Sequence, residues 1–235
     1  MPSLIKNWKL NLLAVFFMGL FSFLGYWQLT RAWYKEQLIN QYQQRLHQPP
    51  ISQQNLNPQA DLRFFQVTLT GYYDNQHTLL LDNKTFHGTT GYEVYTPFRA
   101  DNLSSIILVD RGFINNNGNR SKTPQISPIT GKQTINGLLN LPPKQIVMNE
   151  NIFDPLPSAK LLRVETLNFA KLEKALGYVF FPYTLTLAAA DSNAYTIEWQ
   201  AVTLPPERHY AYATQWFAFA ITLLIIFAIL NWRAS

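Results

Sequence analysis

Cysteine is absent from the chain, and charge is scarce in it. Without a cysteine among its 235 residues, the chain has no disulfide, thiolate zinc site, iron–sulfur cluster, covalently attached c-type haem or thiol nucleophile. Charged residues make up 14% of it and hydrophobic residues 47%, whereas soluble domains are about 25% charged. This composition excludes a disordered, highly charged tail protein.

Familiar catalytic and ligand-binding motifs are missing as well. The ten glycines are scattered and form no phosphate-binding loop, and there is no Gly-x-Ser-x-Gly elbow. The four histidines show no metal-ligand spacing. The net charge of +5 does not indicate nucleic-acid binding, because residues 31–209 hold 16 basic and 14 acidic side chains and are only +2. We expect a protein that is not an enzyme, binds no nucleic acid and has no metal-ion site.

Two long uncharged runs lie near the ends of the chain, at residues 10–29 and 211–230. Each run is about 30 Å long as a helix, which matches the hydrocarbon core of a bilayer. Tryptophans flank both runs, as is typical of membrane interfaces. The runs predict two transmembrane helices. The alternatives are a cleaved signal peptide for the first, although no small-x-small cleavage site follows it, and a buried core helix for the second.

The short flanks of the runs predict the orientation. Lys6, Lys9 and Arg233 lie beside them, and positively charged flanks stay in the cytoplasm. We therefore expect a bacterial inner-membrane protein with the lipid bilayer as a partner. Its expected parts are a cytoplasmic tip (1–9), a first span (10–29), a periplasmic domain (30–210), a second span (211–230) and a cytoplasmic tail (231–235).

Strand patterns dominate the segment between the runs. Strands are expected at 65–70, ending at Gly71, and at 78–81, 92–96, 105–110, 133–139, 179–188 and 195–202. Helices are expected at 31–48, continuing the first span, and after an N-cap at Thr166, closed by Gly177. The fold class is a membrane-anchored α+β protein. Two transmembrane helices bracket a β-rich, antiparallel, barrel-like extramembrane domain with one or two helices.

His209 stands at the start of the second run. On a helix it shares a face with Tyr212, Ala213 and Trp216, which combines an imidazole, aromatic walls and a small residue. The residues alone leave two interpretations open. His209 is an interfacial side chain among belt aromatics, or it is an axial ligand for a haem at the outer interface, because neutral imidazole is a standard haem ligand.

The end of the first run offers a comparable set. Gly25 permits close helix contact, and Gln28 is expected to form an interhelical hydrogen bond. Arg31 can reach a lipid headgroup, a haem propionate or an acidic neighbour. The plainer interpretation of Trp27 and Arg31 is an aromatic belt with a headgroup contact.

Four blocks of sequence occur in a familiar order. They are Gly25-Tyr26-Trp27-Gln28-Leu29-Thr30-Arg31, residues 91–97 (Gly-Tyr-Glu-Val-Tyr-Thr-Pro), residues 107–114 with Asp110-Arg111-Gly112-Phe113 at their centre, and residues 208–217, which open on Arg208-His209. In this order, around a β-rich domain between two spans, they resemble the Surfeit locus protein family of cytochrome c oxidase assembly factors. Two positions depart from the family pattern: Phe113, where tryptophan is common, and Arg208, where asparagine often precedes the histidine.

The resemblance implies a role in building haem–copper oxidases. It implies haem a as a transient cofactor, and as partners oxidase subunit I and haem a synthesis or other oxidase assembly proteins. It carries over His209 as the haem-contacting residue, and we group Tyr212, Trp216, Arg208 and Arg31 with it as the candidate cofactor-binding set. Gly25, Trp27, Gln28, Arg111 and Gly112 are the structural or partner motif.

Alternatives stay open for the motif and for the function. Arg111 and Gly112 have a structural interpretation, with Gly112 in a strand-end turn and Arg111 paired with Asp110 or Asp101. For the whole protein, the main hypothesis is a non-enzymatic factor that binds haem a near His209 and aids its insertion into, or the stability of, subunit I. The second is a scaffold that holds the nascent subunit without haem. The third is a membrane-anchored enzyme acting on a lipid or haem precursor.

Overall fold

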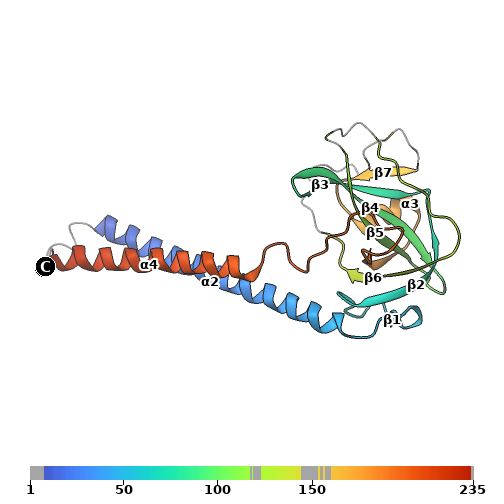
Figure 1. The fold of residues 1–235 in the computed structure, drawn as a ribbon. Coiled ribbons are helices and arrows are strands. Elements are labelled where there is room, and N and C mark those ends of the chain that lie inside the picture. The colour runs from blue at the N-terminus through green and yellow to red at the C-terminus, as the bar shows by residue number, and fades with distance from the viewer. Residues whose placement is uncertain are drawn as a thin grey trace. The chain divides into compact units, whose positions relative to one another are not determined.

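A computed structural model describes residues 8–116, 118, 123–143, 153, 156 and 160–233 (Figure 1). The chain divides into two compact units, one of residues 1–41 with 200–235 and one of residues 42–199. Residues 1–7 of the expected tip and 234–235 of the expected tail lie outside the described residues. The expected boundaries between membrane and domain stay a prediction.

Two long helices make up the first unit: α2 (Trp8–Leu46), whose last turn from Tyr42 belongs to the second unit, and α4 (Pro206–Arg233). The expected continuation of the first run into a helix is confirmed, since α2 is unbroken to Leu46. Both helices are long and apolar enough to cross a membrane. Their most apolar windows are only 6% and 11% buried, whereas a core helix of a soluble protein is mostly buried. The core-helix alternative for the second run therefore loses its support.

The second unit is built on one sheet, with a closed ring at its centre (Figure 1). Its strands are β1 (Ile51–Ser52), β2 (Gln66–Tyr73), β3 (Thr78–Phe86), β4 (Thr89–Ala100), β5 (Ile106–Asn115), β6 (Gln133–Asn140), β7 (Leu161–Val164) and β8 (Phe180–Leu187). Because β2 pairs with both β6 and β4, the strands β2, β6, β8, β5 and β4 form a ring. The expected β-rich, barrel-like domain is confirmed.

Gly71 lies where the ring closes. It pairs with Gln133 of β6 and with Ala100 of β4. A Cβ atom at this position would lie 2.0 Å from the carbonyl oxygen of Arg99, so the two backbones approach as closely as they do only because the residue is glycine. The expectation that the strand ends at Gly71 was wrong, because β2 turns this corner and continues to Tyr73.

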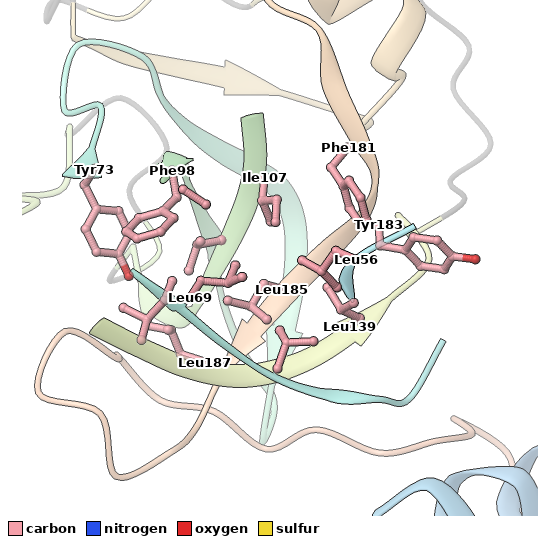
Figure 2. Close-up of a cluster of buried hydrophobic side chains, with 14 of the residues drawn as sticks. Leu56, Leu69, Tyr73, Phe98, Ile107, Leu139, Phe181, Tyr183, Leu185 and Leu187 are labelled. Atoms are coloured by element: carbon pink, nitrogen blue, oxygen red, sulfur yellow. The ribbon is translucent and has the colours of Figure 1, made fainter. Parts of the chain in front are cut away.

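Alternating side chains fill the ring. Along β2, Val67 and Leu69 are buried, and the neighbouring Gln66 and Thr68 are partly exposed. Figure 2 shows Leu69, Leu185 and Leu187 pointing into one cluster from β2 and β8. The alternation of apolar and polar residues that predicted the strand therefore corresponds to side chains that point alternately into the core and away from it.

Helix α3 (Phe169–Leu176) covers a second apolar cluster through the buried Leu172. The expected N-cap was wrong by two residues. The side chain of Asn168 accepts a hydrogen bond from the Lys171 amide at 3.1 Å, so Asn168 takes the place assigned to Thr166. The expected closure by Gly177 is confirmed, because that residue has a φ of 71° in the left-handed region.

The sheet differs from expectation in its connections. Three strand pairs are parallel, namely β1–β2, β3–β7 and β5–β8, and β7 was not expected. The strand expected at 195–202 was wrong, since that stretch contributes one isolated bridge, between Thr196 and Phe113. The stretch reads as a strand because it is rich in β-branched and aromatic residues, but its backbone is bonded to β5 at only a few points.

Candidate functional site

Helices α2 and α4 contact each other within the first unit. A Cβ atom at Gly25 would lie 2.8 Å from two ring carbons of Phe217, and Ala213 is only 1% exposed. Small residues at such a contact let two helices approach closely. The close helix contact expected at Gly25 is therefore present, and its partner across the helices is Phe217.

Aromatic rings extend this contact. The ring of Trp216 stacks on that of Phe21 with centroids 5.7 Å apart and an interplanar angle of 26°. Phe219 packs edge-on against Trp216 at 5.9 Å. Ring pairs of this kind add to the energy of apolar burial, so this end of the interhelical contact is held by aromatic packing.

His209 and Gln28 join the same two helices through a hydrogen bond. The His209 Nδ1 atom lies 2.8 Å from the Gln28 amide oxygen, and His209 is 9% exposed. Because an amide oxygen can only accept, Nδ1 carries the proton and donates it. The expected interhelical hydrogen bond of Gln28 is present, and its partner is the candidate ligand itself.

The other ring nitrogen of His209 is left with a lone pair. Nε2 is buried and has no hydrogen-bond partner among the described residues. A buried polar atom without a partner costs about 1–3 kcal/mol, so such atoms are uncommon and call for an explanation. The arrangement resembles that of metal-bound histidines, in which one nitrogen is fixed by a protein acceptor and the other is free to ligate.

A second polar contact crosses between the helices near His209. The hydroxyl of Tyr210 donates to the Glu36 carboxylate at 3.0 Å. Glu36 was not singled out in the sequence, where it stands among the polar residues after the first run. Together the two hydrogen bonds fix α4 to α2 at neighbouring positions, 209 and 210.

The remaining residues of the candidate cofactor set differ in their contacts and in their exposure to solvent. Arg31 places its guanidinium 5.5 Å from the ring centroid of Trp27, in a cation–π contact. Tyr212 is 46% exposed, and Arg208 is also exposed. The structure thus brings His209 together with Gln28, and Trp216 with Phe21, and it leaves Tyr212 and Arg208 accessible.

Arg111 and Gly112 belong to β5 in the other unit. The Arg111 side chain is 2% exposed; its Nε donates to the Asn193 carbonyl at 3.0 Å, and its guanidinium lies 4.8 Å from the ring centroid of Tyr195. Of the two carboxylates suggested as partners of Arg111, Asp101 pairs instead with Lys132 at 2.7 Å, and Asp110 accepts from the Gly112 amide and the Thr186 hydroxyl. Arg111 therefore holds the stretch after β8 against β5.

Gly112 is held where only glycine fits easily. Its φ is +98°, and a Cβ atom would lie 2.6 Å from both the Thr196 carbonyl oxygen and an Ile197 side-chain carbon. The Thr196 carbonyl is fixed in turn, because it accepts from the Phe113 amide at 2.8 Å. The structural interpretation placed Gly112 in a turn at the end of a strand. That placement was wrong, because Gly112 lies within β5.

Asp110 is a buried acid beside these residues. Its two carboxylate oxygens accept from the Gly112 amide at 3.0 Å and the Thr186 hydroxyl at 3.2 Å. Burial, and next the nearby charge of Glu93, raise the pKa of Asp110 to about 8. Burial likewise raises the pKa of Glu93. These two acids favour a shared proton over two negative charges.

Sequence reasoning missed several residues of these contacts. They are Phe21, Glu36 and Phe217 between the helices, and Asn193 and Tyr195 around Arg111. Phe217 lies in the fourth sequence block, but a block does not show what its residues touch. Gln28 and His209 are 181 positions apart in the sequence, and the fold brings them into contact.

The architecture and the site define a class of protein. It is a membrane-anchored protein in which two apolar helices bracket a closed β ring and meet at a histidine–glutamine contact. More particularly, the chain belongs to the SURF1 family, whose model matches residues 15–221. The resemblance found in the four sequence blocks is confirmed.

Similar proteins occur in bacteria and eukaryotes. A SURF1-like protein of Rickettsia bellii is 26% identical over 235 residues, which cover 94% of this chain and 89% of the relative. The cytochrome oxidase assembly protein SHY1 of Saccharomyces cerevisiae is 31% identical over 110 residues, 45% of this chain and 28% of the yeast protein. Surfeit locus protein 1 of Gallus gallus is 30% identical over 139 residues, 52% of this chain and 45% of the relative. The chain thus matches nearly the whole Rickettsia protein but less than half of the yeast and chicken proteins.

Proposed function

We propose that this chain is a non-enzymatic assembly factor for cytochrome oxidase. Family membership and the similarity to the yeast protein named for that role support the proposal. We further propose that the chain binds haem a at His209 and aids its insertion into, or the stability of, oxidase subunit I. The buried, unpartnered Nε2 of His209 is the observation that carries this second step.

The residues at the helix contact fit a haem ligand. Gln28 accepts from Nδ1, which fixes the imidazole as the tautomer whose Nε2 lone pair can bind iron. Nε2 is enclosed by neighbouring atoms of the protein. A ligand that binds Nε2 must therefore displace those atoms and replace their contacts with its own. His209 would hold a bound haem through Nε2, and the haem would supply an iron centre able to accept that lone pair.

Other side chains of the first unit have complementary chemistry. Arg208 is exposed, and Arg31 is held over Trp27, so two guanidinium groups are available for carboxylates such as haem propionates. Tyr212 and Trp216 offer aromatic faces. In this proposal Gln28 orients His209, the arginines attract the carboxylates, and the aromatic side chains exclude water.

The proposal includes a location. Positive residues flank both apolar runs, which supports cytoplasmic termini and a periplasmic β domain in a bacterial inner membrane. Haem a synthesis proteins and other oxidase assembly proteins are then partners for delivery, and subunit I is the recipient.

A scaffold without haem is the second candidate function. The observation that favours it is that His209 already has a structural task, because its bond to Gln28 and that of Tyr210 to Glu36 fix α4 to α2. In this alternative the two helices form a stable surface for the nascent subunit, and the free Nε2 has no ligand.

The haem content of purified protein tests the main proposal. The protein is produced with and without haem a synthesis, and its absorption spectrum is compared with those of His209→Ala and His209→Met. We expect the alanine variant to be made normally, to lack haem and to lower the haem a content of the assembled oxidase. The methionine variant should keep some haem with an altered spectrum, since a thioether also ligates iron. His47→Ala is the control, because His47 is exposed.

Two results would contradict the haem proposal. Unchanged haem spectra in both His209 variants would show that another residue is the ligand. Wild-type protein that never carries haem, although its deletion still depletes the oxidase, would favour the scaffold.

A further inference from the structure

A cavity of about 480 Å³ lies in the β domain, between the last turn of α2 and the face of β2, β6 and β8. Its size falls within the range of small-ligand pockets, which is about 300–1,000 Å³. All its lining residues belong to the unit of residues 42–199. It is therefore separate from the His209 site, which belongs to the other unit.

The walls of this cavity are apolar and aromatic. Tyr42 and Trp199 form one wall with ring centroids 4.9 Å apart, and Leu138, Leu187 and Ile197 contribute aliphatic surface. Among the described residues, no charged side chain lines it. An ionic ligand buried here would lose its hydration without gaining a partner, so the ligand region that enters must be uncharged.

Three polar side chains in the lining each already make a hydrogen bond within the protein. Gln66 donates to the Leu46 carbonyl, Asn136 accepts from Thr68, and Thr186 donates to Asp110. A peptide segment would bring several backbone N–H and C=O groups that all need partners. A hydrocarbon chain brings none, so the walls suit a hydrocarbon chain better than a peptide.

Helix α2 points to the source of such a chain. The helix that supplies Tyr42 and Leu46 to the cavity is the one that contains the first membrane-crossing run. A protein anchored in a bilayer meets lipids with acyl chains of the right chemistry. Because Tyr42 and Leu46 lie about 20–25 Å along α2 beyond residue 29, the lipid that enters the cavity has to leave the bilayer core. We propose that this cavity binds an acyl chain of a membrane lipid, a function independent of haem binding at His209.

Photolabelling tests the proposal on the full-length chain. The protein is placed in lipid nanodiscs that contain phosphatidylcholine with a diazirine near the end of one acyl chain. After illumination, the labelled residues are mapped by mass spectrometry. We expect label on cavity residues such as Leu138 and Ile197, in addition to label on the membrane-crossing helices, and we expect excess unlabelled lipid to reduce it.

Two neighbouring alanines provide a matched pair of variants. Ala189 lines the cavity and Ala190 does not, and both are exposed, so substitution at either is compatible with folding. Ala189→Trp should fill the cavity and lower its labelling at least tenfold, because displacing two or three methylene groups costs about 15- to 60-fold in affinity. Ala189→Asp should have a similar effect by adding a charge. Ala190→Trp and Ala190→Asp should label as wild type does.

The outcomes separate this proposal from its competitors. Absence of cavity labelling in the wild type, or equal labelling in the Ala189 and Ala190 variants, would overturn it. Efficient cavity labelling by a diazirine-bearing farnesol, with none by the phospholipid, would also overturn it and assign the cavity to isoprenoids. Because His209→Ala leaves the cavity intact, labelling that persists in that variant would support the lipid site whatever becomes of haem.

Discussion

Replacing Gly112 with alanine should destabilise the β domain more than the same change at any open glycine. Backbone strain at a φ of +98° costs about 1–3 kcal/mol. Overlap of the new methyl group with the Thr196 carbonyl and Ile197, each 2.6 Å from it, adds about 1–3 kcal/mol of overpacking. The expected loss is therefore about 4 kcal/mol, a large part of the roughly 5–15 kcal/mol that stabilises a typical domain.

Gly177 provides the control for this prediction. It also has a positive φ, of 71°, but nothing lies within 4 Å of a Cβ atom there. Gly177→Ala should thus cost only the strain of the left-handed conformation, about 1–2 kcal/mol. The difference between the two variants isolates the overlap with the 196–197 stretch.

Thermal unfolding of the purified full-length protein measures the difference. Followed by near-ultraviolet circular dichroism, a loss of about 4 kcal/mol should lower the midpoint by roughly 8–16 °C for a unit of this size, and the control should lower it by a few degrees. Equal shifts for the two variants would refute the reasoning. They would mean that the stretch bonded to β5 yields to the methyl group at little cost.

Three further predictions concern the membrane helices and the buried acid. A phosphatase that is active only outside the cytoplasm should be silent when fused after residue 235 and active when inserted at the exposed Gly118; the opposite pattern would exclude cytoplasmic termini. Gly25→Leu should lower the yield of functional protein, because even its Cβ would lie 2.8 Å from Phe217, and a normal yield would show that the helices do not depend on this contact. The raised pKa of Asp110, about 8, means that the folded state holds its proton more tightly than the unfolded state does. Its stabilisation is complete below pH about 4 and is lost as pH rises towards 8. The unfolding temperature should therefore fall between pH 5 and 8, and Asp110→Asn should flatten that slope; an equally steep slope in the variant would assign it to other groups.

The sequence predicted the elements with strong local signals. Two uncharged runs, alternating strands and a helix closed by Gly177 all depend on chemistry within a few residues, and the structure contains them. The four sequence blocks likewise identified the family. These features could be found because each local pattern agrees with the fold around it.

The features that the sequence did not predict depend on distant partners. A glycine after an alternating run is typical of a strand end, which is how Gly71 was interpreted. In the structure β2 continues through Gly71, where the Arg99 backbone approaches closely. Residues 195–202 have strand-forming side chains, but few of their backbone groups find a neighbouring strand. The sequence predicted an interhelical hydrogen bond for Gln28 and a ligand role for His209, but nothing local showed that the two residues bond to each other or that the second nitrogen of His209 has no partner.

The position of β8 in the ring has a consequence for biosynthesis. This strand lies between β6 and β5, although it is the last strand in the chain. At about 5–20 residues per second, the ribosome needs roughly 2–8 seconds to make the 40 residues from the end of β6 to the start of β8. During that interval the nascent chain exposes two strand edges with unmet hydrogen-bonding groups, which invite pairing with other chains. The barrel can close only once β8 has left the ribosome, and His209 follows the end of β8 by only 22 residues. Closure of the barrel and synthesis of the candidate haem ligand therefore come close together in time.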